Sequence, residues 1–374
     1  MKKLGFGLMR LPLLVATDDK TIDINQAKDM VDMFIDRGFT YFDTAWMYHA
    51  FESEKATKEI LTSRYERSAY TLATKLHCAF VKSFEDRDKI FNTQLKNTGV
   101  DYFDYYLLHD MGTEHLKIYE KFDCFNWLRE KKKAGLVKKI GLSFHDTADL
   151  LDKILTKYPD MDFVQLQINY LDWESNTIQS KKCYEVARKH NKPIIVMEPV
   201  KGGTLANVND TVRDMFKNLH PDWSPAQWAL RFAAGLDDVM MVLSGMSSLA
   251  QLNDNTTFMD NVAPLNQDEL MAVRTAADMI NKNICIACTG CNYCTDGCPM
   301  NIAIPKYFAL YNEDKREVLS PSREWTAQID YYENLLASFG AAGDCIGCGA
   351  CEAACPQHLP IIEHLKQVKN HFGK

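Results

Sequence analysis

Apolar residues in roughly the first 260 positions form short runs that alternate with amphipathic stretches. Eight of these runs are rich in β-branched and aromatic residues, and many are nearly continuous. Such runs are typical of parallel strands that are buried on both faces. The predicted strands are Leu4–Leu8, Thr40–Phe42, Thr71–Thr74, Tyr105–Leu108, Lys139–Leu142, Phe163–Gln165, Ile194–Met197 and Met240–Leu243.

The stretches between the runs have helical periodicity. Asn25–Asp36 places Ala27, Met30, Val31 and Phe34 on one face, and Lys117–Lys133 is predicted as one helix. Eight strands, each followed by a crossover, predict an α/β fold of the (β/α)₈ TIM barrel type. A doubly wound sheet is the alternative, but its G-x-G-x-x-G turn is absent after the first strand.

Further helices are predicted after the barrel. Leu265–Asn281 begins with Asn266 as a cap and with Glu269 three residues later, which is the spacing of a capping box. Ile304–Tyr311 and Glu324–Phe339 also have helical patterns. We expect Asp314–Arg323 to form an exposed connection between them.

The composition is that of an ordinary globular protein, with 46% apolar and 25% charged residues in 374. A net charge of −7 argues against nucleic acid or an anionic membrane as the main partner. No apolar run approaches the roughly 20 residues of a membrane span, and the first residues lack a signal-peptide pattern. We therefore expect a cytoplasmic protein.

The twelve cysteines divide the chain. Three are scattered, at Cys78, Cys124 and Cys183, whereas nine lie between Cys285 and Cys355. In a reducing compartment, such density indicates metal binding rather than disulfides. The predicted domains are residues 1–280, the barrel with its following helix, and residues 281–374, a helical metal-binding domain.

Two cysteine motifs share the spacing C-x₂-C-x₂-C-x₃-C-P, which is the bacterial ferredoxin pattern. In that pattern the fourth cysteine of each run binds the other cluster, so we predict two [4Fe–4S] clusters. One would take Cys288, Cys291, Cys294 and Cys355, and the other Cys298, Cys345, Cys348 and Cys351.

Zinc is the alternative metal, but two runs with proline after the last cysteine favour iron–sulfur. We expect Cys285 not to be a ligand. The helical insertion between the motifs resembles α-helical ferredoxin domains.

Four polar residues follow or end consecutive predicted strands. They are Asp43, Tyr48, Lys75 and His109. Active sites of (β/α)₈ barrels lie at this end of the strands. In residue type, order and context, the four resemble the catalytic tetrad of the aldo/keto reductases, and the resemblance covers roughly residues 1–265.

The chemistry of carbonyl reduction suits these groups. Tyr48 would donate a proton to the carbonyl oxygen, and Lys75 would lower the pKa of that phenol from its usual value of about 10. Asp43 would hold Lys75 in its charged form, and His109 would orient the carbonyl. Each residue alone has an ordinary structural explanation, so the prediction depends on the four together.

The resemblance also implies a nicotinamide site for NADP(H) or NAD(H). The family serine and glutamine correspond to Ser143 and Gln165, and the stretch Glu198–Leu205 resembles the loop over the pyrophosphate. Gln167 and Asn169 read as ordinary polar residues of a strand. The implied cofactor-binding residues are Ser143, Gln165, Pro199, Gly202, Gly203, Ser244, Gly245, Ser247, Gln251 and Asn255.

Several positions depart from the family pattern. Phe144 stands where the family has asparagine, and Met197 where it has the aromatic residue that stacks on nicotinamide. Gly245 and Gln251 replace the cations that hold the 2′-phosphate in NADPH-specific members, which leaves the choice between NADH and NADPH open. Candidate residues for an apolar substrate pocket, which could equally be rim packing, are Trp46, Phe80, Met111, Phe144 and His145.

A barrel fused to clusters has three possible uses. First, the clusters deliver electrons from a redox partner protein such as a ferredoxin, which requires a converter such as a flavin. Second, the barrel reduces a small-molecule aldehyde or ketone with NAD(P)H, and the clusters are structural or sense redox state. Third, the barrel is a nicotinamide-binding sensor, with the ferredoxin-like domain for docking. The complete tetrad favours an enzyme.

Overall fold

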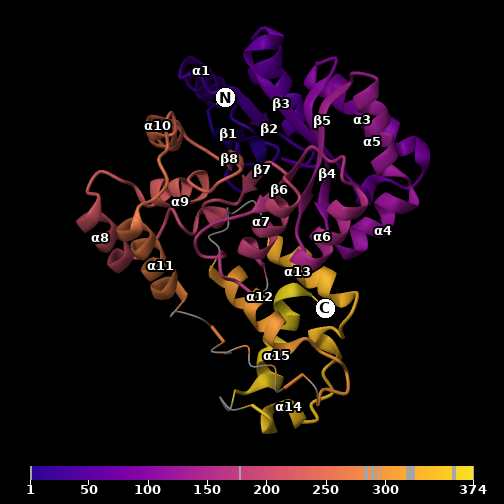
Figure 1. The fold of residues 1–374 in the computed structure, drawn as a ribbon, viewed down its shortest axis with the longest axis vertical. Helices are drawn as coiled ribbons and strands as arrows, with labels where there is room; N and C mark the ends of the chain where they lie inside the picture. The colour runs from indigo at the N-terminus through magenta and orange to yellow at the C-terminus, as the bar shows by residue number, and fades with distance from the viewer. Residues whose placement is uncertain are drawn as a thin grey trace.

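The computed structural model describes residues 2–176, 178–281, 285–286, 288, 290, 292, 294–295, 297–316, 325–355 and 359–373. Eight parallel strands form a closed barrel in the order of the sequence, and helices surround it (Figure 1). The predicted fold class is therefore confirmed, and each predicted strand is present. The strands are β1 (Leu4–Gly7), β2 (Tyr41–Asp43), β3 (Thr71–His77), β4 (Phe103–Met111), β5 (Val137–Phe144), β6 (Phe163–Gln167), β7 (Ile194–Met197) and β8 (Val239–Ser244).

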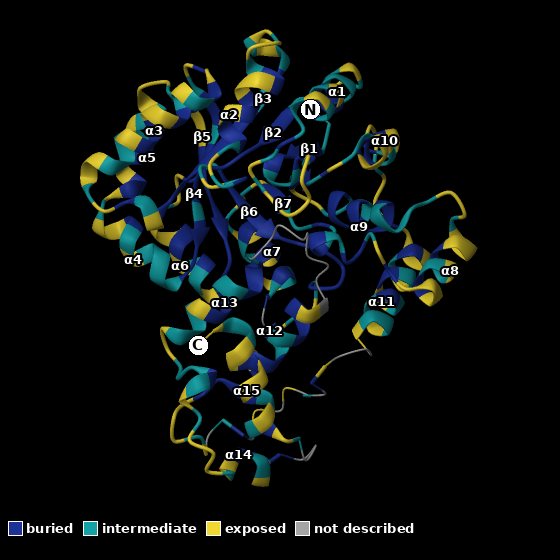
Figure 2. Ribbon diagram, turned by 180° about the vertical axis from the view of Figure 1, so that it is seen from behind, coloured by how far each residue is buried: buried dark blue, intermediate teal, exposed yellow. Residues whose placement is uncertain are grey.

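The strands are buried because side chains cover both of their faces. Figure 2 shows the strands as buried and much of the outer helix surface as exposed. One apolar cluster fills part of the barrel interior, with Tyr41, Ala73, Leu107, Phe163, Ile195, Met241 and Leu243. A larger cluster lies between the strands and the helices. This two-sided burial explains the continuous apolar runs in the sequence.

The helices of the barrel follow their strands. They are α1 (Ile24–Asp36), α2 (Ser53–Thr57), α3 (Phe84–Thr98), α4 (Thr113–Lys121), α5 (Cys124–Lys133), α6 (Ala148–Lys157), α7 (Ser180–Lys189), α8 (Asp210–Leu219), α9 (Pro225–Ala234) and α10 (Leu249–Phe258). The prediction of one helix over Lys117–Lys133 is wrong. The chain turns at Asp123, which has a left-handed backbone with φ of 49°. The Arg87 side chain donates to the carbonyl oxygens of Phe122 and Asp123, which stabilises the turn.

Helix α11 (Gln267–Asn281) begins with the predicted capping box. The Glu269 amide donates to Asn266 Oδ1 at 3.0 Å, and the Asn266 amide donates to Glu269 Oε2 at 2.7 Å. These bonds satisfy amides that have no partner within the helix, so the sequence signal marks the true start.

The remaining helices are α12 (Ile304–Arg316), α13 (Ala327–Leu336), α14 (Ala350–Ala353) and α15 (Ile361–Phe372). They share an apolar cluster that is separate from the barrel core. Asp314, predicted in an exposed connection, instead lies buried in α12, where its carboxylate bonds to Thr326 and His371. The rest of that predicted connection after Arg316 lies outside the described residues. Within the described parts of the chain, no helix is both long enough and apolar enough to span a membrane.

Candidate active site

Three of the four predicted catalytic side chains meet in one hydrogen-bonded group at the carboxyl ends of β2 and β3. The Lys75 ammonium donates to Asp43 Oδ1 at 2.5 Å and to Tyr48 Oη at 3.2 Å. It also donates to the carbonyl oxygen of Thr44 at 2.9 Å. Asp43 ends β2, Tyr48 lies in the turn that follows, and Lys75 lies in β3.

His109 reaches the same group from β4. Its ring centroid lies 5.9 Å from that of Tyr48, and the two planes make an angle of 80°. The carbonyl oxygen of His109 accepts a hydrogen bond from Tyr119 Oη at 2.6 Å, which anchors its backbone. Its Nδ1 atom is buried and has no hydrogen-bond partner among the described residues. The four predicted residues are therefore neighbours in space.

Burial and charge act against each other in this group. Lys75 is fully buried, and Asp43 is almost so. Burial alone would lower the pKa of Lys75, but Asp43 and Tyr48 raise it above its usual value. Burial raises the pKa of Tyr48, and the positive charge of Lys75 offsets only part of that rise. Burial and the charge of Lys75 also hold the pKa of His109 well below its usual value. The phenol is therefore protonated and the imidazole neutral near pH 7.

A buried polar network lies behind Lys75 and was not found from the sequence. Gln94 donates to the carbonyl oxygen of Lys75 at 2.9 Å and to Glu54 Oε1 at 2.8 Å. Thr74 donates to the same Glu54 oxygen at 2.8 Å, and Tyr106 donates to Gln94 at 2.6 Å. Since glutamate and glutamine within helical stretches usually face solvent, nothing in a single sequence distinguishes these two.

Ser143 and Gln165, expected at the nicotinamide, lie opposite each other on β5 and β6. Ser143 Oγ accepts a hydrogen bond from the Asp110 amide at 2.8 Å. Gln165 Nε2 lies 3.5 Å from Met197 Sδ, whereas its Oε1 is buried without a hydrogen-bond partner among the described residues. Since such an atom is costly to leave unpaired, Gln165 fits a ligand that donates a hydrogen bond there.

The loop after β7 contains Pro199, Gly202 and Gly203. Its glycines have positive φ angles of 61° and 106°, and Glu198 Oε2 accepts from the Gly202 amide at 2.6 Å. Lys201 of this loop forms a buried ion pair with Asp172 at 2.7 Å.

Gln167 and Asn169 belong to the surroundings of this ion pair. Gln167 Nε2 donates to Asp172 at 2.9 Å, and Asn169 Nδ2 donates to it at 2.7 Å. Asn169 also donates to the carbonyl oxygen of Glu198 at 3.1 Å, which connects this group to the loop after β7. The two residues are therefore more than ordinary polar positions in a strand, and the ion pair itself was missed.

The residues expected near the adenosine phosphate gather at the end of β8. Ser244 accepts from Asn255 at 3.0 Å, and the Ser247 amide donates to Gln251 Oε1 at 2.7 Å. Gly245 lies against Arg10, since a Cβ atom there would be 2.9 Å from Arg10 Cδ. The structure thus places the cation Arg10 beside the loop after β8, which lacks a cation of its own. The sequence did not predict this contact, because Arg10 follows β1 and is far from Gly245 along the chain.

The candidate pocket residues separate into two groups. Met111, Phe144 and His145 are buried, and the first two belong to the main core. Trp46 and Phe80 are partly buried and each lies edge-on to Phe51, at 5.9 and 5.6 Å between ring centroids. Phe51, which the sequence reasoning missed, is exposed. These three aromatic rings form a continuous rim.

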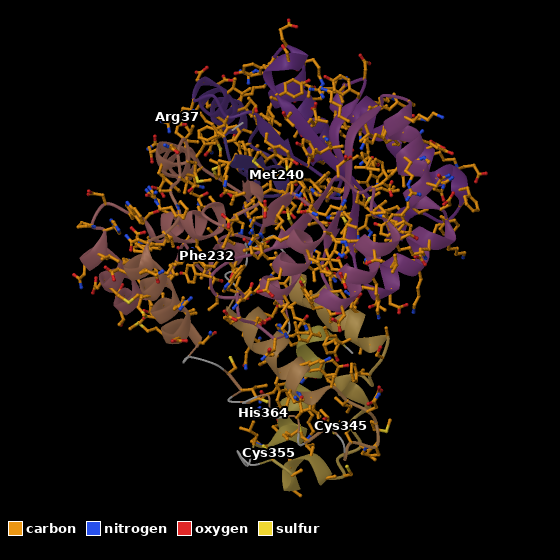
Figure 3. All side chains as sticks on the ribbon, viewed as in Figure 1. Arg37, Phe232, Met240, Cys345, Cys355 and His364 are labelled. Atoms are coloured by element: carbon orange, nitrogen blue, oxygen red, sulfur yellow. The ribbon has the colours of Figure 1, made fainter. Side chains whose placement is uncertain are left out.

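The cysteines of the two motifs belong to the C-terminal segment, where Figure 3 labels Cys345 and Cys355. One apolar cavity is lined by Cys298, Cys345, Cys348 and Cys351, together with Ile302, Ile304, Ile346, Ile362 and Leu365. These four sulfurs are the set predicted for one cluster. Soft thiolates in apolar surroundings suit an iron–sulfur cluster.

Less of the other predicted set is described. Cys294 and Cys355 are buried in the C-terminal apolar cluster, and Cys288 packs against it. Cys291 lies outside the described residues. Cys285, expected not to be a ligand, is exposed.

Comparisons with known proteins match both parts of the chain. A family model described as the aldo/keto reductase family matches residues 3–278, and one described as a 4Fe-4S dicluster domain matches residues 287–359. Aldo-keto reductase family 1 member C21 of Rattus norvegicus is 30% identical over 223 residues, which are 50% of this chain and 69% of that protein.

Solved structures share the fold. The holo form of an aldo-keto reductase from Bacillus halodurans has a TM-score of 0.58 and 24% identity, and covers 73% of this chain and 91% of its own. An aldo-keto reductase from Klebsiella pneumoniae in complex with NADPH has a TM-score of 0.56 and 18% identity, and covers 73% of this chain and 90% of its own.

Proposed function

Since the chain belongs to the aldo/keto reductase family of oxidoreductases, we propose that it reduces an aldehyde or ketone with NADPH or NADH, with Tyr48 as the proton donor. The observation that carries the proposal is the position of the Lys75 ammonium, which donates to both Asp43 and Tyr48. A phenol beside a buried cation can release its proton, because the cation stabilises the phenolate.

Each residue has one part in the proposed reaction. His109 donates a hydrogen bond to the carbonyl oxygen and so fixes its orientation. Tyr48 gives its proton to that oxygen, and Lys75 stabilises the phenolate until water restores the proton. Asp43 keeps Lys75 charged within a buried site. A bound nicotinamide would supply the hydride to the carbonyl carbon.

Gln165 supports a nicotinamide beside this group. Its Oε1 atom has no hydrogen-bond partner among the described residues and can accept from a carboxamide, and the loops after β7 and β8 would hold the phosphates. We infer that Ser143 of β5 contacts the nicotinamide, and that the other cofactor contacts come from the ends of β7 and β8 and the residues after them, namely Pro199, Gly202, Gly203, Ser244, Gly245, Ser247, Gln251 and Asn255. Arg10 beside Gly245 supports binding of an anionic cofactor of either kind.

The C-terminal segment would hold two [4Fe–4S] clusters through the eight cysteines of its two motifs, with residues 281–374 as a separate domain. Such clusters pass electrons one at a time, so they suit exchange with a redox partner protein or the sensing of redox state. The cavity lined by four cysteines supports the assignment. Cysteines that bind metal or remain as free thiols also favour a reducing, cytoplasmic location.

The test is an anaerobic titration of the reconstituted protein with NADH and NADPH, followed by visible absorption and electron paramagnetic resonance. A panel of aldehydes and ketones is then assayed with the nicotinamide that binds. We expect saturable binding of one nicotinamide and turnover of at least one carbonyl. Binding without any turnover across the panel would favour a sensor, and absence of both would refute the proposal.

A further inference from the structure

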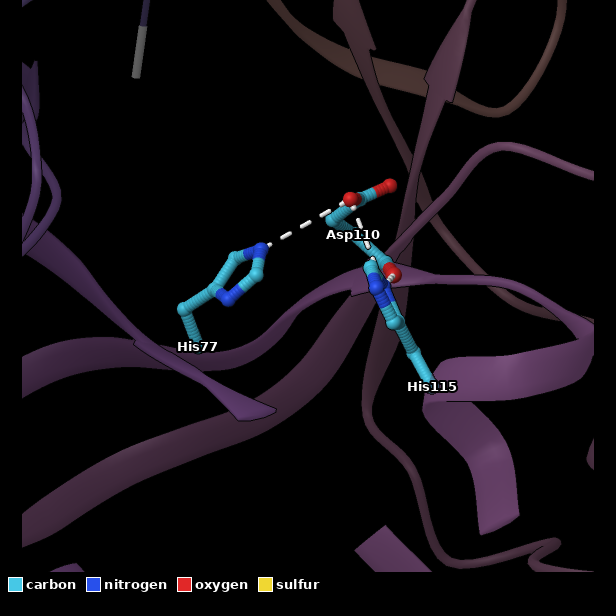
Figure 4. A group of neighbouring side chains, drawn as sticks. All are labelled: His77, Asp110 and His115. Atoms are coloured by element: carbon cyan, nitrogen blue, oxygen red, sulfur yellow. Dashed lines mark hydrogen bonds and ion pairs between the residues drawn. The ribbon is translucent and has the colours of Figure 1, made fainter. Parts of the chain in front are cut away.

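Hydrogen bonds and charges converge on Asp110, the residue directly after His109. The Asp110 amide donates to Ser143 Oγ at 2.8 Å, and its carbonyl oxygen accepts from His115 Nδ1 at 2.5 Å. One carboxylate oxygen, Oδ2, lies 3.6 Å from His77 Nε2 and 3.3 Å from His115 Nδ1. Figure 4 shows the two imidazoles approaching this oxygen from different sides. We call Asp110, His77, His115 and Ser143 the Asp110 clamp.

The backbone inside the clamp has an unusual conformation. Asp110 has a φ of 55°, in the left-handed region that residues with a side chain rarely adopt. The pairing of β4 with β5 also shifts register between Leu108 and Met111, so a bulge contains His109 and Asp110. A bulge re-aims the side chains it contains, and such strain persists only where surrounding contacts enforce it.

A bound cation is the obvious alternative for two histidines and an aspartate, but the hydrogen bonds oppose it. His77 Nδ1 accepts from the Ala79 amide at 3.1 Å, so a neutral His77 carries its hydrogen on Nε2, facing Asp110. His115 Nδ1 contacts a carbonyl oxygen and therefore also carries a hydrogen. Both nitrogens that face the carboxylate are donors, whereas a metal needs their lone pairs.

The clamp keeps its carboxylate ionised. Burial alone would raise the pKa of Asp110, but His77, His145, His115 and His109 hold it well below its usual value. The negative charge thus holds Nε2 of His77 toward Oδ2, while the N–H group of His115 contacts the carbonyl oxygen of Asp110 and lies 3.3 Å from the same carboxylate oxygen. The ring of His77 in turn lies edge-on to that of His109, at 5.3 Å between centroids and 87° between planes.

We propose that Asp110 is a positioning residue, and that its clamp holds the bulge of β4 so that His109 faces Tyr48. This inference rests on the proposed reductase function. Asp110 itself transfers no proton in this scheme, because it acts through the backbone of His109 and through the ring of His77. The clamp therefore links β3, β4, β5 and α4 at one end of the barrel.

The test compares Asp110→Ala and Asp110→Asn in the cluster-loaded protein. Alanine removes the carboxylate and tolerates the left-handed backbone poorly, so we expect kcat to fall roughly 10²-fold with little change in KM. Asparagine keeps an acceptor and adopts that backbone more readily, so it should recover much of kcat. Asp123→Ala is the matched control, because Asp123 has a φ of 49° in the turn between α4 and α5. It removes an aspartate from a left-handed position and should leave kcat unchanged.

Two measurements do not depend on activity. In crystal structures, the His109 ring should turn away from Tyr48 in Asp110→Ala but not in Asp110→Asn, which tests the clamp even if no carbonyl is turned over. An unmoved ring with wild-type kcat in Asp110→Ala would overturn the proposal. So would stoichiometric zinc in the wild type that is lost in His115→Gln. Failure of the reductase proposal would instead appear as an inactive wild type.

Discussion

At the scale of single residues, the buried pair of Lys75 and Asp43 dominates the proposed site. Removing one member of a buried ion pair leaves the other uncompensated, which typically costs about 3–5 kcal/mol. Replacing both members by neutral groups of similar size often costs far less. We therefore expect the contribution of each charge to the free energy of unfolding to depend strongly on the presence of the other.

A double-mutant cycle tests this dependence. We expect Lys75→Met to lower the free energy of unfolding by about 3–5 kcal/mol, since it leaves the carboxylate of Asp43 buried alone. Asp43→Asn should also destabilise, and the double variant should lose less than the sum of the two. Urea unfolding followed by barrel tryptophan fluorescence measures the three values. Additive losses would mean that the pair is not coupled.

Tyr48 can be tested by removing its hydroxyl alone. We expect Tyr48→Phe to lower kcat by about 10²–10⁴-fold, because the carbonyl oxygen loses its general acid. Nicotinamide binding, measured by fluorescence, should remain. Tyr102→Phe is the matched control. Tyr102 lies just before β4, at the opposite end of the barrel from Tyr48, and its hydroxyl contacts Lys138. Equal kcat values in wild type and Tyr48→Phe would exclude a proton-donor role.

The sequence predicted which polar residues end the strands but not what supports them. Asp43, Lys75 and His109 could be selected because strand ends converge in a barrel. Glu54, Gln94 and Asp172 could not, because their partners lie on other elements and no local pattern marks a buried hydrogen bond. The left-handed backbone of Asp110 is likewise invisible without the bulge that imposes it.

At the scale of elements, continuous apolar runs located every strand, whereas strand ends were less accurate. β3 extends to His77, beyond the predicted Thr74, because Lys75 to His77 still pair with β4. Polar residues at the site interrupt the apolar pattern before the strand itself ends. The division between α4 and α5 had no sequence signal either, since neither glycine nor proline occurs there.

Helix α13 packs against the carboxyl ends of β4 and β5. Asn334 donates to the carbonyl oxygen of His145 at 3.1 Å, and the Tyr331 ring lies 5.8 Å from that of His145. Gly112 lies beneath Asn334, because a Cβ atom there would be 2.5 Å from Asn334 Nδ2. A larger residue at position 112 would therefore require the Asn334 side chain to move.

This close approach gives an element-scale prediction. Gly112→Ala should destabilise the protein by about 1–3 kcal/mol, because the methyl group displaces Asn334 from His145. Asn334→Ala alone should cost less, since it removes one hydrogen bond. The double variant should be more stable than Gly112→Ala, because the second change frees the space that the methyl group needs. Thermal unfolding of the cluster-loaded proteins measures these differences. A double variant whose loss of stability equals the sum of the losses in the two single variants would contradict the packing argument.

At the scale of the whole molecule, the cysteine-rich segment contacts the end of the barrel at which the proposed reaction occurs. Besides α13, Glu313 of α12 accepts from Ser175, which follows β6, at 2.9 Å. Figure 1 shows α12 and α13 between the barrel and the far end of the segment, where α14 lies. The segment therefore packs on this end of the barrel through α12 and α13, and α14 lies on the side away from the barrel.

Iron content tests the assignment of the cysteines. Cys288→Ser should reduce the iron content from about eight to about four atoms per chain, because it removes a ligand from one of two four-iron clusters. Cys285→Ser is the matched control three residues away and should retain about eight. Iron and sulfide analysis after anaerobic reconstitution measures both. Loss of iron in Cys285→Ser would show that this exposed cysteine is a ligand.

The contact between the two parts of the molecule should depend on pH through Asp330 of α13. Burial raises the pKa of the Asp330 carboxyl well above its usual value, and the charge of Asp110 on β4 raises it further. Trp325 Nε1 donates to Asp330 Oδ1 at 2.9 Å, whereas Oδ2 is buried without a hydrogen-bond partner among the described residues. An acid with a raised pKa stabilises the fold fully below its unfolded pKa of about 3.9, and this stability is lost as pH rises through the folded pKa.

Asp330→Asn keeps the shape of the protonated acid but cannot ionise. We therefore expect the stability of this variant relative to wild type to increase steadily as pH rises from about 5 to 8, because only the wild type must keep a buried proton. Thermal unfolding of the cluster-loaded proteins across that range measures the difference. Glu333→Gln removes an exposed carboxylate from the same helix, so its pH dependence reports the loss of charge without burial. A stability difference between Asp330→Asn and wild type that does not change with pH would contradict this. It would mean that Asp330 ionises freely and that the charge of Asp110 does not raise its pKa.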